Sequence, residues 1–266
     1  MKDYGKDLFR GTAVYYAAYR PVYPETLLHL LHDRFSLDGS QTVIDLGCGP
    51  GDLALRLADH CREVIGVDQE QEMLDVARML QRKKRKENVS WVHGTVEEYL
   101  NQFHRMNVVT IAKAFHWMDR AGTLDSLYEF VVPGGGVAVI DDYEPDKAAT
   151  EWQETFNEVV RRWYGPTRRA GNTTYSHPEI THEQIIEQSA FDLEVYELPE
   201  VTIRWDIPSI IGNHYSTSFG KKQYLGEDAH LFEEEVKAAL GSCGMYEERR
   251  RVSVKIGRKQ GKRGSR

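Results

Sequence analysis

The chain has 266 residues, of which 41% are hydrophobic and 11% aromatic, enough for a packed core and too apolar for a disordered polypeptide. The formal net charge is −7, and nine of the 34 basic residues follow Glu248, so the preceding segment carries 25 basic and 41 acidic residues. Such an acidic body repels phosphate backbones and disfavours nucleic acid as a partner.

Membrane and secretion signals are not found in the sequence. No apolar run approaches the ~20 residues that span a bilayer, and the charged start MKDYGKDLFR has no apolar signal core. The cysteines Cys48, Cys61 and Cys243 are sparse and form no CxxC pair. We therefore expect a cytoplasmic protein with reduced thiols, no membrane partner and no metal site, present as a monomer or homodimer.

From Thr42 to about Tyr143, short apolar strands alternate with amphipathic helices. Asp119 is placed to cap the helix that follows the fourth strand, and the run 133–136 (PGGG) is expected to end that helix. This alternation predicts an α/β fold with a parallel sheet covered by helices on both faces. Strands are expected at 42–46, 64–67, 89–93, 108–112 and 137–141.

The pattern changes after Tyr143. Residues 144–179 combine an amphipathic helix with a polar stretch that contains glycine and proline, as expected for a helical cap over the open end of the sheet. Residues 192–205 and 250–256 alternate as two late antiparallel strands would. Further helices are expected at 180–189, 207–213 and 228–240.

The segment 43–51, VIDLGCGPG, leads from a strand through a glycine-rich turn into a helix. Glycine lets the backbone turn tightly and lets a ligand lie against it. Its spacing is GxGxG, whereas dinucleotide-binding folds use GxGxxG, and Asp52 would place an acid against phosphate oxygens. Asp45 suits a cationic ammonium or a bridging water better than phosphate. The turn therefore disfavours a nicotinamide-dependent oxidoreductase.

This segment resembles motif I of the class I S-adenosylmethionine-dependent methyltransferases, and further matches follow in order. VIGVD ends a strand at Asp68, an acid that in this family accepts both ribose hydroxyls. Met73 resembles the residue that covers the adenine, and 94–97 (GTVE) follows strand three where the family contacts the adenine amino group. The resemblance implies a Rossmann-like seven-stranded methyltransferase sheet, mostly parallel with an antiparallel last strand, and an inserted helical cap.

The same resemblance implies the cofactor S-adenosyl-L-methionine and the product S-adenosyl-L-homocysteine. Residues 18–24, AYRPVYP, are similar to a family segment that folds over the cofactor as a lid, with Arg20 suited to the cofactor carboxylate. The implied cofactor contacts are Tyr19, Arg20, Asp45, Gly47, Cys48, Gly49, Gly51, Asp68, Gln69, Met73, Thr95, Val96, Ala112 and Ala114.

Strand four leads into 114–117, AFHW, and lacks the Asn/Asp-Pro-Pro-aromatic motif of enzymes that methylate planar amino groups. It resembles instead the branch that contains trans-aconitate methyltransferase and acts on small acids or natural products. His116 lies at the carboxyl end of a central strand, where ligands bind, and is the candidate catalytic residue. It serves as general base if the acceptor is a neutral hydroxyl, or shapes the pocket if the acceptor is an anion, which the resemblance favours slightly.

Contacts to the acceptor are expected from Tyr16, Phe115, His116, Trp117, Tyr143 and Arg168, with Arg169 and His177 as further holders of an anionic acceptor. The expected organisation is N-terminal lid helices (1–35), a cofactor-binding core (36–143), a cap (144–179), a segment completing the sheet (180–258) and a basic tail (259–266). We predict methyl transfer to a small molecule, on oxygen in preference to nitrogen or carbon. The alternatives are an RNA or protein methyltransferase and a non-catalytic cofactor-binding module.

Overall fold

The computed structural model describes residues 7–100, 105–171, 173–175, 178–241 and 244–261. Cys243, His177 and the end of the basic tail lie outside these ranges, so the roles expected of them stay predictions. The described chain forms two compact units. The sheet unit comprises Val22–Tyr143, His177–Pro199 and Arg251–Arg266, and the helical unit comprises Met1–Pro21, Glu144–Ser176 and Glu200–Arg250.

The sheet unit is built from alternating strands and helices, as the sequence predicts. Its strands are β1 (Thr42–Leu46), β2 (Glu63–Asp68), β3 (Val89–His93), β4 (Met106–Ala112), β5 (Val131–Asp141), β8 (Asp192–Glu197) and β11 (Ser253–Arg258). Its helices are α2 (Glu25–Phe35), α3 (Asp52–Leu57), α4 (Gln71–Lys84), α5 (Val96–Leu100), the 3₁₀ helix η1 (Phe115–Trp117), α6 (Arg120–Phe130) and α8 (His182–Glu187).

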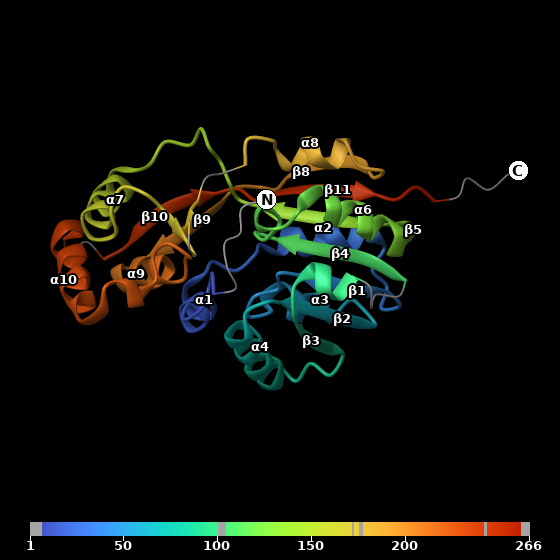
Figure 1. The fold of residues 1–266 in the computed structure, drawn as a ribbon, viewed down its shortest axis with the longest axis horizontal. Coiled ribbons are helices and arrows are strands. Elements are labelled where there is room, and N and C mark those ends of the chain that lie inside the picture. The colour runs from blue at the N-terminus through green and yellow to red at the C-terminus, as the bar shows by residue number, and fades with distance from the viewer. Residues whose placement is uncertain (1–6, 101–104, 172, 176–177, 242–243, 262–266) are drawn as a thin grey trace, which may run out of the picture. The chain divides into compact units, whose positions relative to one another are not determined.

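The seven strands form one sheet in the order β3-β2-β1-β4-β5-β11-β8 (Figure 1). Strands β1 to β5 pair in parallel, and β11 pairs antiparallel with both β5 and β8. The expected α/β, mostly parallel sheet is thereby confirmed. The expectation of two late antiparallel strands was wrong, because β8 runs in the same direction as the first five and only β11 is reversed.

The segment 192–205 is not one strand. It breaks at Leu198–Glu200, where Pro199 has no N–H to continue a ladder. The part before the break is β8 of the main sheet, and the part after it is β9 (Val201–Trp205), which pairs antiparallel with β10 (Tyr246–Arg250) in the helical unit. Alternation alone could not show that one run of residues is shared between two sheets.

The glycine-rich run 133–136 lies inside a strand. Helix α6 begins after Asp119, whose side chain accepts from the Gly122 N–H as expected, and it ends at Phe130. Strand β5 starts at once with Val131, so the expected start at 137 was wrong. The register with β4 shifts between Met106 and Val108, which takes up the extra residues as an irregularity.

Two apolar cores cover the two faces of the sheet. Successive residues of a strand point to opposite faces, so Val43 and Ile44 of β1 belong to different cores. Helices α2 and α3 pack on the first face through residues such as Leu31 and Leu55, and α6 packs on the second through Leu124 and Leu127. With both faces buried, the carboxyl ends of the parallel strands remain as the place for ligands.

The helical unit contains α1 (Ala13–Tyr19), α7 (Glu151–Tyr164), α9 (Ile207–Tyr215), α10 (Ala229–Leu240), the 3₁₀ turns η2 (Lys222–Tyr224) and η3 (Gly226–Asp228), and the short hairpin of β6 (Arg169–Ala170) and β7 (Thr173–Thr174). Its core gathers Val159, Ile211, Tyr215, Phe232 and Val236. Among the described residues, no helix combines the length and apolar character required to cross a membrane.

Candidate active site

The backbone N–H groups of the glycine turn after β1 all donate hydrogen bonds within the protein. The N–H groups of Gly47 and Cys48 donate to the Val67 carbonyl at 2.8 and 3.1 Å, and the N–H of Gly51 donates to the Cys48 carbonyl at 3.0 Å. The Gly49 N–H donates to Oδ2 of Asp68 at 2.8 Å. Since residue 50 is proline, every backbone N–H of residues 47–51 is taken within the protein, and the turn has none left to cradle a phosphate.

Glycine is required in this turn for steric reasons. Gly47, Gly49 and Gly51 all have positive φ angles, of 67°, 54° and 83°. A Cβ on Gly51 would lie 2.3 Å from the Trp91 ring, and one on Gly47 would lie 2.5 Å from Cβ of Ala114. The structure thus brings the turn against β3 and against the segment that follows β4, where two of the predicted contact regions lie.

Carboxylates surround the turn. Asp45 is 2% exposed, and its Oδ1 accepts from the Thr110 hydroxyl at 2.7 Å. Burial raises the pKa of Asp45 to about 7, against that hydrogen bond, and the charges of Asp68 and Asp52 add to the rise. Burial also raises the pKa of Asp52 and of Asp68. Three acids at one turn favour a ligand that carries positive charge.

Asp68 keeps capacity for a ligand. Its Oδ1 accepts from the Glu70 N–H and its Oδ2 from the Gly49 N–H, each at 2.8 Å. A carboxylate offers about four acceptor positions, so acceptor capacity remains for a ligand hydroxyl. The two backbone donors hold the carboxylate in place at the carboxyl end of β2.

The other expected cofactor contacts of the sheet unit lie at the ends of β1 to β4 or on the helices that follow them. Met73 and Ala114 are buried, and Gln69 accepts at its carbonyl from the His93 ring. The Thr95 hydroxyl accepts from the Glu98 N–H and so caps α5. Cys48, Val96 and Ala112 are buried or half-buried beside them.

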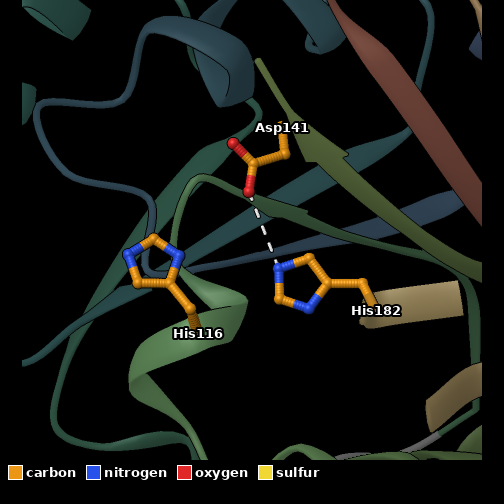
Figure 2. A group of neighbouring side chains, drawn as sticks. All are labelled: His116, Asp141 and His182. Carbon is orange, nitrogen blue, oxygen red and sulfur yellow. Dashed lines mark ion pairs between the residues drawn. The ribbon is translucent and has the colours of Figure 1, made fainter. Parts of the chain in front are cut away.

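Three polar side chains meet at the carboxyl ends of β4 and β5. His116 lies on η1, Asp141 is the last residue of β5, and His182 is the first residue of α8. One ligand-type atom of each lies within 4.8 Å of those of the other two, and Nε2 of His182 is 3.6 Å from Oδ2 of Asp141 (Figure 2). The sequence analysis proposed only His116; strand-end position was the available signal for Asp141, and none marked His182.

The neighbours of His116 in the AFHW segment have different environments. The Trp117 ring packs beside His116 with centroids 4.6 Å apart. Phe115 is 1% exposed and its ring lies 5.1 Å from that of His182, in the core of the sheet unit. Tyr143, two residues after Asp141, is 49% exposed. Contact of these side chains with an acceptor stays a prediction.

The remaining expected site residues belong to the helical unit. The Tyr19 ring packs on Gly212 of α9, where a Cβ would lie 2.3 Å from the ring. Arg20 lies over the Tyr16 ring at 4.9 Å, and Arg168 lies over Phe219 at 5.0 Å. Burial lowers the pKa of His214 to about 3, and the charges of Arg168 and Arg20 add to this effect. Within this unit, therefore, the two arginines lie near one buried imidazole.

The seven-stranded sheet has the methyltransferase fold. Residues 43–135 match the family described as "Methyltransferase domain". An uncharacterized methyltransferase of Schizosaccharomyces pombe is 28% identical over 158 residues, which are 59% of this chain and 60% of that protein. One from Mycobacterium tuberculosis is 30% identical over 159 residues, 59% of this chain and 61% of that protein. The matches thus span about three fifths of the length of these relatives.

A solved structure shows the same fold at lower sequence identity. It is that of an S-adenosylmethionine-dependent methyltransferase from Geobacter sulfurreducens in complex with S-adenosyl-L-homocysteine. It is 18% identical, covers 94% of this chain and 98% of its own, and has a TM-score of 0.53. The chain therefore has the methyltransferase fold, and residues 43–135 are similar to the methyltransferase domain family.

Proposed function

We propose that this chain binds S-adenosylmethionine in the sheet unit and transfers its methyl group to a small molecule. The observation that carries the proposal is the glycine turn, whose N–H groups are all used internally and which is surrounded by Asp45, Asp52 and Asp68. A pyrophosphate needs free donors and tolerates no such acids. A ligand with a diol, an ammonium and a sulfonium fits both features.

Individual residues have separate tasks in this proposal. Asp68 accepts the two ribose hydroxyls, and Asp45 takes its charged form opposite the positive end of the cofactor. When bound, S-adenosylmethionine supplies an activated methyl group on a sulfonium.

The acceptor is proposed to be a small molecule with a reactive oxygen. The segment around His116 lies at the carboxyl ends of β4 and β5, the edge of a parallel sheet at which substrates bind. A cytoplasmic location and a monomeric or homodimeric state remain part of the same prediction from the sequence.

Calorimetry tests the cofactor assignment. S-Adenosylhomocysteine should bind the wild-type chain and NAD should not. Asp68→Ala should weaken S-adenosylhomocysteine binding by roughly 1–3 kcal/mol, because two charge-assisted hydrogen bonds to the ribose are lost. Asp125→Ala, on the exposed face of α6, is the matched control and should bind as the wild type does. Tighter binding of NAD than of S-adenosylhomocysteine would refute the proposal.

A further inference from the structure

The group of His116, Asp141 and His182 is held together by the fold. β4 and β5 pair in parallel with Ala112 opposite Ile140, so the residues just beyond them come to the same edge. Helix α8 begins with a capping box in which the Thr181 side chain accepts from the Gln184 N–H, and this places His182 in the first turn. Figure 2 shows the Asp141 carboxylate and the two imidazole rings facing one another.

Arg120 determines which nitrogen of His182 carries the proton. Its Nη1 donates to the Ile180 carbonyl at 2.7 Å and lies 3.3 Å from Nδ1 of His182. A guanidinium has only donors, so Nδ1 of His182 must be the acceptor. The proton of a neutral His182 is then on Nε2, the atom that faces Oδ2 of Asp141.

Asp141 is an oriented anion. Its Oδ1 accepts from the N–H groups of Asp142 and Tyr143 at 2.7 and 3.1 Å. Burial raises the pKa of Asp141, but the hydrogen bond from His182, the positive charge on His116 and the Asp142 N–H outweigh it and hold this pKa well below the usual range. The carboxylate is thus kept charged, with a fixed direction, in front of His116.

Two histidines and a carboxylate are also the donor set of many transition-metal sites. A metal-bound histidine presents a lone pair to the metal and donates its other N–H to a carbonyl or carboxylate. Here the contact with Arg120 demands the reverse for His182: a lone pair at Nδ1 and the proton at Nε2. The arrangement therefore favours proton transfer over metal binding.

Other charged and aromatic groups adjoin the cluster. The Trp117 ring packs against His116, Arg120 of α6 lies behind His182, and Lys113 forms an ion pair with Asp142 just beyond β4 and β5. Because the charge of Lys113 is matched by Asp142, Asp141 supplies the negative charge in front of the ring. That charge stabilises a proton on the His116 ring.

We propose that His116 accepts the proton of a neutral hydroxyl on the acceptor, and that Asp141 and His182 are positioning residues for it. This inference rests on the proposed methyl transfer. The acceptor oxygen bonds the methyl carbon, the carbon–sulfur bond breaks with its electron pair left on sulfur, and the hydroxyl proton passes to His116. The positive charge of the sulfonium is thereby replaced by that of an imidazolium, which Asp141 stabilises. The substrate class is an alcohol or phenol rather than a carboxylate.

Proton NMR of the histidine rings tests the inference on the full chain without any acceptor. His116→Gln identifies the His116 resonance. In the wild type His116 should hold its proton to higher pH than the ~6.5 of an unperturbed histidine. Asp141→Asn should lower its proton affinity roughly 10-fold or more, because the facing anion is lost. Asp125→Asn, a matched change of an exposed aspartate on α6, should leave the proton affinity of His116 unchanged.

Three results would overturn the inference. The first is a His116 titration in the wild type at or below the ordinary value, which can be read even if Asp141→Asn does not fold. The second is a folded Asp141→Asn chain with an unaltered His116 titration. The third is tight 1:1 binding of Zn²⁺ by calorimetry that is lost in Asp141→Asn, which would make the cluster a metal site. Failure to bind S-adenosylhomocysteine would refute the proposed function instead, and is measured separately.

Discussion

Asp45 is a buried acid whose pKa is raised by its surroundings. An ionised carboxyl that is 2% exposed and close to two other acids is unfavourable in the ligand-free protein, and its pKa rises to about 7. The unfolded chain has the ordinary value near 4, so the folded state binds more protons between these values. The contribution of Asp45 to stability is therefore present at low pH and is lost as the pH rises through about 7.

This sign gives a prediction for Asp45→Asn. The amide keeps an acceptor for the Thr110 hydroxyl but cannot ionise. At pH 8 we expect the variant to have a higher melting temperature than the wild type and a free energy of unfolding that is larger by at most about 4 kcal/mol. At pH 5 both differences should be smaller. Thermal unfolding without cofactor at the two pH values measures this. An equal difference at both would show that Asp45 is not charged in the folded chain.

At the scale of elements, the turn between β1 and α3 needs a positive φ at Gly51 and also needs space there for the Trp91 ring. Gly51 has φ of 83°, which a residue with a Cβ adopts only at a cost, and its α-carbon lies against the Trp91 ring. That ring is itself fixed, since its Nε1 donates to Gln81 at 2.7 Å. The Trp91 ring therefore has little freedom to move away from a Cβ at position 51.

A comparison of Gly51 with Gly39 separates the requirement for a positive φ from the requirement for space around the α-carbon. Gly39 has a similar φ of 91°, but a Cβ there would meet nothing within 4 Å. Gly39→Ala should lower the free energy of unfolding by about 1–2 kcal/mol through backbone strain alone. Gly51→Ala should lose a further 1–3 kcal/mol, approximately, from the steric overlap with Trp91. Urea denaturation compares them, and equal losses would mean that Trp91 moves freely.

At the scale of the whole molecule, charge separates small-molecule from nucleic-acid substrates. The formal net charge of −7 opposes association with phosphate backbones, although the C-terminal residues are basic. We expect no retardation of RNA in a gel-shift assay at about 150 mM salt. A shift whose affinity falls steeply with added salt would instead support the RNA methyltransferase alternative and assign a role to the basic tail.

Much of the fold follows from local sequence, and the candidate cofactor site was predicted from it. Strand and helix periods, the cap at Asp119 and the GxGxG turn depend on adjacent residues, so they can be read from the chain directly. The direction of β8, the split of 192–205 and the strand through 133–136 could not, because they depend on which partner each segment pairs with. Alternation is the same for either direction of a strand.

The candidate catalytic residues likewise divide into one that the sequence predicted and two that only the structure revealed. His116 was predicted as the candidate catalytic residue from its place at the end of a strand. Only the tertiary structure decided that Asp141 and His182 meet His116, since they come from separate elements that β-sheet pairing and a capped helix bring together. The tautomer of His182 depends in turn on Arg120 from a fourth element, α6. Sequence determines which chemical groups the chain possesses, whereas long-range packing determines which of them lie close enough to interact.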